Sequence, residues 1–170
     1  MARIFISYRR DDSAYVASML AQKLTADFGA GSVFMDVDNI PIGVDFRKHL
    51  QNAVEQADVL LTVIGDDWLN AANPDGTRRL DDPADFVRIE IAHALQRGIP
   101  IVPVLSGTSH MPSSSELPAS LTDLAFSNAA ELRAGRDLQM HLNKISTGVR
   151  DLLDRARPRH QKLTVSPDGS

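Results

Sequence analysis

Short apolar runs alternate with longer segments of helical periodicity along most of this chain. The runs are too short for helices, rich in branched aliphatic residues and bounded by polar residues, which is typical of strands covered on both faces of a sheet. We expect such strands at residues 4–7, 32–37, 59–64 and 99–105, and a weaker one near 124–129.

The segments between these runs repeat apolar residues at the spacing of a helix that buries one face. The first is expected to begin at Asp12 or Ser13 and to end at Phe28, before glycines that tolerate a positive φ. The others are expected over residues 46–57, 83–97 and 136–155. This alternation predicts an α/β fold, in which helices sandwich a parallel sheet through right-handed crossovers.

Two prolines complicate the fourth strand. Pro100 and Pro103 each remove a backbone donor, so we expect that strand to lie near an edge of the sheet or to be irregular. Residues 106–120 are rich in serine and proline and are predicted to form a loop excursion. Because the apolar pattern ends after Leu153, we expect one domain over residues 1–154 and a mobile tail at 155–170.

Composition narrows the class of protein. A chain of 170 residues with 43% hydrophobic and 24% charged residues is typical of a single soluble domain. No cysteine is present, which excludes disulfides, thiolate catalysis and cysteine-bound zinc, and the five histidines show no spacing of metal ligands. A net charge of −4 argues against nucleic acid as a partner. No apolar segment is long enough to span a membrane and no signal pattern opens the chain, so we expect a cytoplasmic location.

The first strand, Ile4–Ser7, runs into four charged residues within the next five positions, namely Arg9, Arg10, Asp11 and Asp12. The carboxyl ends of parallel strands are where α/β sheets bind their ligands, and loops at that edge collect functional residues. We therefore expect these charges to form the rim of a site.

The third helix carries a carboxylate beside its apolar stripe. Val87 and Ile91 belong to the stripe, and Glu90 lies in the adjacent row, one turn after Phe86. A carboxylate at such an edge loses part of its solvation and interacts more strongly with a cationic centre. From spacing alone, the commoner interpretation is a solvated glutamate paired with Arg97 or another basic neighbour.

Three sequence strings together resemble the Toll/interleukin-receptor (TIR) domain family, from Arg3 to about Leu153. Residues 5–10 (FISYRR) resemble its first box, residues 32–43 (SVFMDVDNIPIG) its second strand and BB loop, and residues 87–95 (VRIEIAHAL) the helix that carries the glutamate of NAD-cleaving members. Each string is weak alone, but their order and separations are specific. The resemblance implies a flavodoxin-like, doubly wound, five-stranded parallel sheet in the order 2-1-3-4-5, with helices on both faces.

The resemblance also implies an NAD+ nucleosidase of the bacterial type, acting as a glycohydrolase, a cyclase or both, with NAD+ as substrate and no cofactor. Glu90 would hold the nicotinamide-side ribose and stabilise the positive charge that grows as nicotinamide leaves. The products would be ADP-ribose or a cyclic isomer. Substrate binding is expected from Ser7, Arg9, Arg10, Asp36 and Phe86.

Each of these substrate-binding residues also has a purely structural interpretation. Arg9 and Arg10 are adjacent and point differently, so one of them is expected to reach phosphates or Asp36 while the other is solvated. For Asp36, holding its loop is favoured over orienting the ribose. For Ser7, a buried hydroxyl that bonds its own backbone is the commoner case. Phe86 replaces the tryptophan of many NAD-cleaving members, and it could simply pack at the helix start.

The BB loop is expected to serve assembly. Pro41 stiffens the bend at Gly43 and presents Ile40 and Ile42 outward, and exposed aliphatic residues suggest contact with another subunit. In the family this loop packs against a neighbouring TIR domain, so activity is expected to require self-association. The alternative is a loop folded over its own sheet.

A second function remains open, namely a TIR interaction module without catalysis that docks on other TIR domains. A phosphoacceptor receiver is disfavoured because no lysine lies between Lys48 and Lys144 to follow its fifth strand. Related enzymes are usually fused to a sensor, so this chain is either a fragment or works beside a separate sensor or effector protein. The resemblance implies a role in immune or antiviral defence, or in interference with host signalling.

Overall fold

The computed structural model describes residues 2–35 and 40–161, with side chains described up to residue 156. Within these residues all strands join one parallel sheet, made of β1 (Ile4–Ser7), β2 (Val33–Phe34), β3 (Val59–Ile64), β4 (Ile101–Leu105) and β5 (Ala130–Glu131). The strand order is β2-β1-β3-β4-β5. The predicted α/β fold and sheet order are therefore confirmed.

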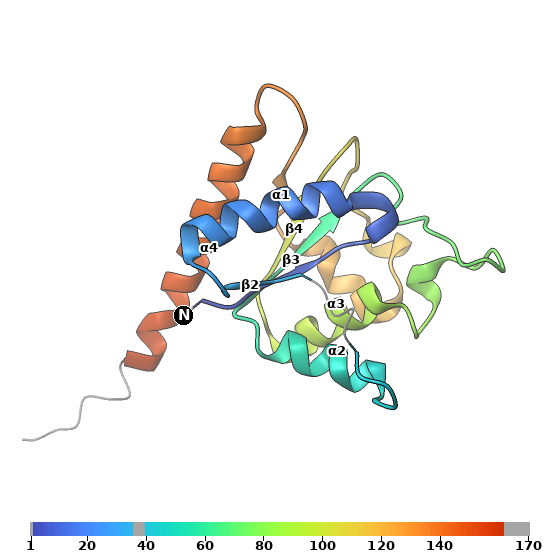
Figure 1. The fold of residues 1–170 in the computed structure, drawn as a ribbon. Helices are drawn as coiled ribbons and strands as arrows, with labels where there is room; N and C mark the ends of the chain where they lie inside the picture. Colours follow the sequence, from blue (N-terminus) through green and yellow to red (C-terminus); the bar gives the residue numbers. More distant parts are fainter. Residues whose placement is uncertain (1, 36–39, 162–170) are drawn as a thin grey trace, which may run out of the picture.

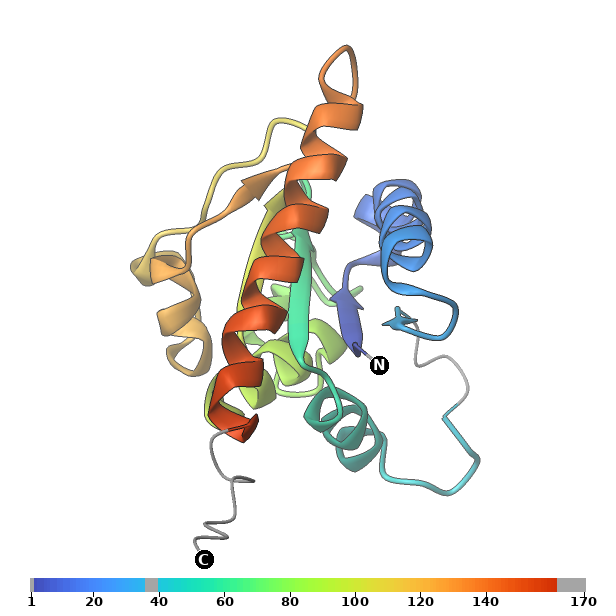
Figure 2. The ribbon, with the colours of Figure 1, turned by 90° about the vertical axis from the view of Figure 1, so that its left-hand side faces the viewer.

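Helices cover both faces of this sheet, namely α1 (Arg10–Phe28), α2 (Phe46–Glu55), α3 (Phe86–Arg97) and α4 (Leu138–Gln161). Helices α1 and α4 lie on one face, and α2 and α3 lie on the other (Figures 1 and 2). The three layers follow from the sequence, because β3 is buried along its whole length and so requires cover on both sides.

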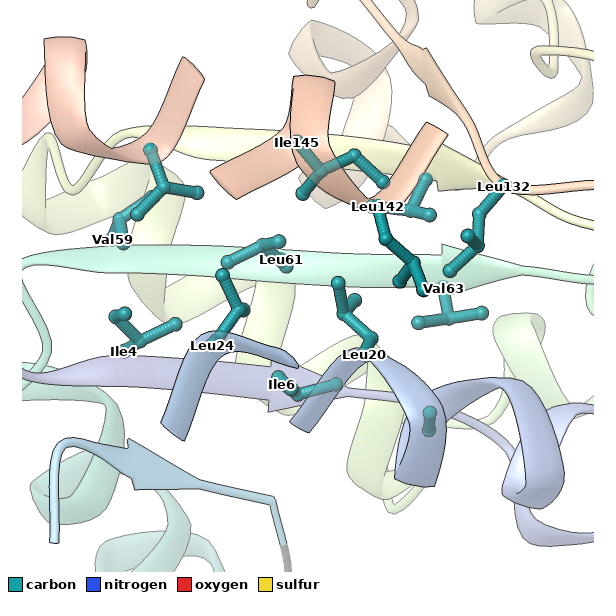
Figure 3. Packing of buried hydrophobic residues seen from close by; sticks show 13 residues of the cluster. Ile4, Ile6, Leu20, Leu24, Val59, Leu61, Val63, Leu132, Leu142 and Ile145 are labelled. Carbon is teal, nitrogen blue, oxygen red and sulfur yellow. The ribbon is translucent and has the colours of Figure 1, made fainter. Parts of the chain in front are cut away.

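The side chains of β1 alternate between two apolar clusters, one on each face of the sheet. Ile4 and Ile6 pack with α1 and α4, as Figure 3 shows, whereas Phe5 packs with α2 and α3. Because strand side chains repeat every second residue, Ser7 lies on the same face as Phe5. The last residue of β1 therefore presents its hydroxyl towards α3.

The helix starts differ from the sequence prediction by a few residues. Helix α1 begins at Arg10, and Ser13, which was expected near its cap, has non-helical backbone angles inside it (φ −137°, ψ 19°). Helix α3 begins at Phe86 and is capped by Asp85, whose side chain accepts a hydrogen bond from the backbone of Arg88. Pro83 thus precedes the helix instead of occupying its first turn.

Strand β4 tolerates its proline without irregularity. It lies next to the edge strand, between β3 and β5. The Leu105 carbonyl accepts a bond from Leu132 on the β5 side, and Pro103, two residues earlier, faces the same side. Pro103 has no N–H, but this position faces β5, whose pairing with β4 begins only at Val104. The missing donor therefore removes no hydrogen bond between β4 and β3.

The prediction of a strand near residues 124–129 is wrong. Residues Ala119–Phe126 form a 3-10 helix, η3, and the edge strand β5 follows it. Leu121 and Leu124 are both buried against the α2–α3 side, and a spacing of three places both on one face of a 3-10 helix. The apolar residues of this segment therefore follow a helical period and not an alternating one.

Two further predictions concern the loop at 106–120 and the C-terminal segment. The predicted excursion at 106–120 contains the short 3-10 helix η2 (Ser114–Glu116), closed by a capping box between Ser113 and Glu116, and its last two residues begin η3. Helix α4 continues through residues 155–161, where the tail was expected, and residues 162–170 lie outside the described part. No helix in the described ranges has the length and apolar character needed to cross a membrane.

Two glycine substitutions are expected to change stability in opposite directions. Gly98 ends α3 with φ +67°, so Gly98→Ala should lower the free energy of unfolding by about 1–2 kcal/mol. Gly148 lies in α4 with open space around its added Cβ and no positive φ, so Gly148→Ala should raise that free energy by about 0.5–1 kcal/mol. Urea denaturation measures both values, and shifts of the same sign would contradict the assignment.

Candidate active site

A cleft of about 440 Å³ opens beyond the carboxyl end of β1, which is within the range of small-molecule sites. Its walls come from the residues that follow β1, from the long connection between β3 and α3, and from the first turns of α3. The polar and aromatic residues that line it are Tyr8, Arg9, Arg10, Asp11, Asn73, Arg79, Asp82, Asp85, Phe86 and Glu90. Arg9, Arg10 and Asp11 of the charged segment after β1 therefore line a cleft, whereas Asp12 is not among its lining residues.

Glu90 is a buried acid in this wall. Its residue is only 5% exposed, and Ser7 Oγ donates a hydrogen bond to Glu90 Oε1 at 3.1 Å. The bond connects the last residue of β1 with the second turn of α3, because Ser7 lies on the α3 face of the strand. The alternative of a solvated glutamate paired with Arg97 is wrong for this residue.

Arg97 belongs to a separate contact between α2 and α3. Its Nη2 atom lies 2.7 Å from Glu55 Oε1, and His93 Nε2 lies 2.9 Å from the same oxygen. The hydrogen bond with His93, followed by the charge of Arg97, lowers the pKa of the Glu55 carboxyl. Helix α3 is thus held at two places, in its second turn by the contact of Glu90 with β1 and at its last residue by the contact of Arg97 with α2.

Arg9 is not a free cation at the rim. It is 4% exposed, and its Nη1 and Nη2 atoms donate to the two carboxylate oxygens of Asp85, each at 2.9 Å. Its Nε atom donates to the Trp68 carbonyl at 3.0 Å. Trp68 itself is fully buried, so it anchors the long connection between β3 and α3. Neither Asp85 nor the Trp68 carbonyl was predicted from the sequence as a partner.

Phe86 and Arg10 lie at the more exposed part of the cleft. Phe86 is 44% exposed, and its ring packs against Phe46 with centroids 5.3 Å apart. One part of Phe86 therefore packs while another faces the cleft, and its contact with substrate stays a prediction. Arg10 is exposed, and Arg79, which the sequence did not single out, also lines the cleft and forms a 3.5 Å ion pair with Asp11.

The BB loop lies partly outside the described residues. Asp36, predicted to bind substrate or hold the loop, is among residues 36–39 and lies outside them. Ile40 is half-buried, whereas Pro41, Ile42 and Gly43 are exposed. The outward presentation of Ile42 agrees with the prediction, and that of Ile40 is only partial.

The arrangement suits chemistry that develops positive charge near a fixed carboxylate. Glu90 is held by a hydroxyl donor and shielded from bulk water, so its interaction with a nearby cationic centre is weakly screened. Among residues 2–35 and 40–156, no group of three or more histidine or acidic side chains is placed to hold a metal ion.

Comparison with known proteins assigns the family. A family profile described as TIR domain matches residues 4–141. In curated proteins, NAD(+) hydrolase sarm1 of Drosophila melanogaster is 30% identical over 125 residues, which are 74% of this chain and 9% of that protein. The chain belongs to the TIR domain family.

Solved structures show the same fold at lower identity. The TIR domains of the activated Roq1 resistosome, which directly recognises the pathogen effector XopQ, match 88% of this chain and 99% of their own (TM-score 0.62, 13% identity). A metazoan TIR-STING receptor from C. gigas, solved in complex with 2′,3′-cGAMP, matches 84% of this chain and 39% of its own (TM-score 0.55, 18% identity). Both likenesses concern the fold.

The buried ion pair should dominate local stability. Arg9→Met leaves the Asp85 carboxylate buried without its cation and should lower the free energy of unfolding by about 3–5 kcal/mol. Arg78 offers a matched control, because it also binds an aspartate through two nitrogens and a backbone carbonyl, but at a more exposed place. Arg78→Met should cost about 1 kcal/mol or less. Equal losses in urea denaturation would show that burial adds nothing to the Arg9 pair.

Proposed function

We propose that this chain cleaves the glycosidic bond between nicotinamide and ribose in NAD+, with Glu90 as the catalytic carboxylate. The observation that carries the proposal is the buried Glu90 side chain, fixed by Ser7 Oγ in the wall of a cleft at the carboxyl end of β1. Membership of the TIR family and similarity to a relative named as an NAD(+) hydrolase support the choice of substrate.

The proposed reaction needs one carboxylate. The bond between C1′ of the ribose and the pyridinium nitrogen breaks, and its electron pair neutralises the ring, so nicotinamide leaves without a strong general acid. The ribose becomes an oxocarbenium-like cation, which the carboxylate of Glu90 stabilises more strongly than it stabilises the neutral sugar. Water then adds at C1′ and releases a proton to give ADP-ribose, whereas attack by an adenine nitrogen or a ribose hydroxyl gives a cyclic product.

Other cleft residues have roles consistent with their placement. Ser7 orients the Glu90 carboxylate through its hydroxyl. The exposed part of the Phe86 ring offers a flat apolar surface to a planar base. Arg10 and Arg79 line the cleft, and their guanidinium groups are proposed to bind the pyrophosphate. Substrate binding by Asp36 stays a prediction.

The active form is proposed to be self-assembled. The fully exposed Ile42 side chain and the exposed Val44 nearby form an apolar surface on the BB loop, close in sequence to α2 and its aromatic contact with Phe86. Burial of such a surface in a neighbouring TIR domain would favour association. The same surface supports the second candidate function, a TIR interaction module without catalysis. A defence role and a separate sensor partner stay predictions.

Glu90→Gln is expected to abolish nicotinamide release. The amide keeps the shape of the side chain and an oxygen that accepts from Ser7, but it lacks the negative charge that stabilises the cationic sugar, so the rate should fall at least 100-fold. Chromatography of NAD+ incubated with each protein measures nicotinamide, ADP-ribose and cyclic products together.

A matched control comes from the same helix pair. Glu55→Gln also removes one charge that contacts α3, but outside the cleft, and it should keep the rate within about threefold of the native chain. The protein concentration should be raised at least 100-fold across the series, because assembly is proposed to be required. A native chain that releases no nicotinamide over this range would favour the interaction module, and equal activity of Glu90→Gln would exclude catalysis by Glu90.

Ile42→Asp is expected to separate assembly from the chemistry. A charge on the exposed loop surface opposes burial in a neighbouring subunit, so the concentration needed for half-maximal specific activity should rise at least tenfold. Ile42→Leu keeps an apolar side chain and should behave like the native chain. Light scattering measures association in the same samples. Unchanged association and activity in Ile42→Asp would remove the loop from the proposed interface.

A further inference from the structure

Arg9 lines the cleft, but its guanidinium group is fully engaged by other residues of the protein. The two terminal guanidinium nitrogens of Arg9, Nη1 and Nη2, donate to Asp85, and the pair is almost completely buried, with side chains that are 2% and 8% exposed. The third donor, Nε, is bound to the backbone of the β3–α3 connection at Trp68. A phosphate could recruit this guanidinium only by separating a buried ion pair, which is strongly unfavourable.

Two polar contacts join the end of β1 to the start of α3. One is the Ser7–Glu90 hydrogen bond, and the other is the Arg9–Asp85 ion pair. Two residues of extended chain cover about 6.6 Å, and five residues of helix rise about 7.5 Å. Because these spans are similar, the hydrogen bond and the ion pair can form at the same time. Two contacts at separate points restrict rotation and tilt of the helix more than one contact would.

Asp85 connects the ion pair to the helix backbone. Its Oδ2 atom accepts from the backbone N–H of Arg88 while the carboxylate also binds Arg9. The first turn of α3 is thus capped by a side chain that is itself held in place, and Glu90 follows in the next turn. Any loosening of this cap moves the helix start on which the Glu90 carboxylate depends.

We propose that Arg9 and Asp85 are positioning residues, and that their buried ion pair holds Glu90 in the orientation needed for cleavage while taking no part in phosphate binding. This inference rests on the proposed function of Glu90. It replaces the prediction that Arg9 binds substrate, and it assigns any contact with phosphate to Arg10 and Arg79, which also line the cleft.

Conservative variants of both partners test the proposal kinetically. Arg9→Lys keeps the charge but loses the two-point geometry, and Asp85→Asn keeps a helix cap but loses the charge. Each should lower kcat for NAD+ cleavage 10- to 100-fold and leave KM within about twofold, because a misplaced reacting group slows chemistry without weakening binding. The double variant should lose no more than the worse single variant, since both substitutions break the same contact.

A phosphate ligand would behave differently. Arg9→Lys would then raise KM with little change in kcat, and Asp85→Asn would lower KM by freeing the guanidinium. Either result would overturn the proposal. Arg78→Lys is the matched control, because it alters the similar but more exposed Arg78–Asp81 pair outside the cleft, and it should leave both constants unchanged.

Hydrogen exchange gives a readout that does not depend on activity. The backbone amides of residues 88–91 should exchange at least tenfold faster in Arg9→Lys and Asp85→Asn than in the native chain or in Arg78→Lys, while amides of β3 keep their protection. Native-like exchange in both variants would overturn the positioning role. If the native chain releases no nicotinamide but the variants still loosen α3, the proposed function fails and the structural part of this inference stands.

Discussion

The contact between the end of β1 and the start of α3 is the interaction on which the site depends. The sheet fixes β1 through parallel pairing on both of its edges, with β2 and with β3. Alternation along the strand then sends Ser7 to the α3 face, where it meets Glu90. A displacement of one residue in β1 would turn this hydroxyl towards α1 and α4, so the register of the sheet determines which residues form the cleft.

Local periodicity predicts the strands, the helices and the apolar stripe beside Glu90, whereas the order of the sheet comes from the family resemblance, and spacing alone favours a solvated Glu90 that the structure instead buries. The burial of β3 and the helical stripe around Val87 and Ile91 are each visible in a short window of residues. The contacts of Arg9 are different, since Trp68 and Asp85 lie 59 and 76 residues away along the chain. No local pattern marks such a partner, and Asp85 appears in the sequence only as one of several acids before a helix.

The remaining differences occur where two local rules compete. Residues 124–129 contain apolar residues at a density that suits a short strand, yet Leu121 and Leu124 follow the period of a 3-10 helix and pack with α3. At the start of α1, Ser13 is a good capping residue, but the chain begins its helix at Arg10 and bends at Ser13 instead. For residues 119–126, packing against α3 decides between two locally acceptable structures.

The polar residues of the cleft occupy places where the rest of the domain uses apolar ones. Ser7 continues the face of Phe5, and Glu90 lies beside the buried Val87 and Ile91 on α3. An aliphatic pair at these two positions would bury as much surface without dehydrating a carboxylate, which is costly even when hydrogen-bonded. Local departures from the packing rule that reduce stability are expected at functional sites. The same reasoning applies to Arg9. Burying its charge reduces stability, so we infer that the Arg9–Asp85 pair is there to fix the start of α3 in one orientation, which apolar packing would fix less strictly.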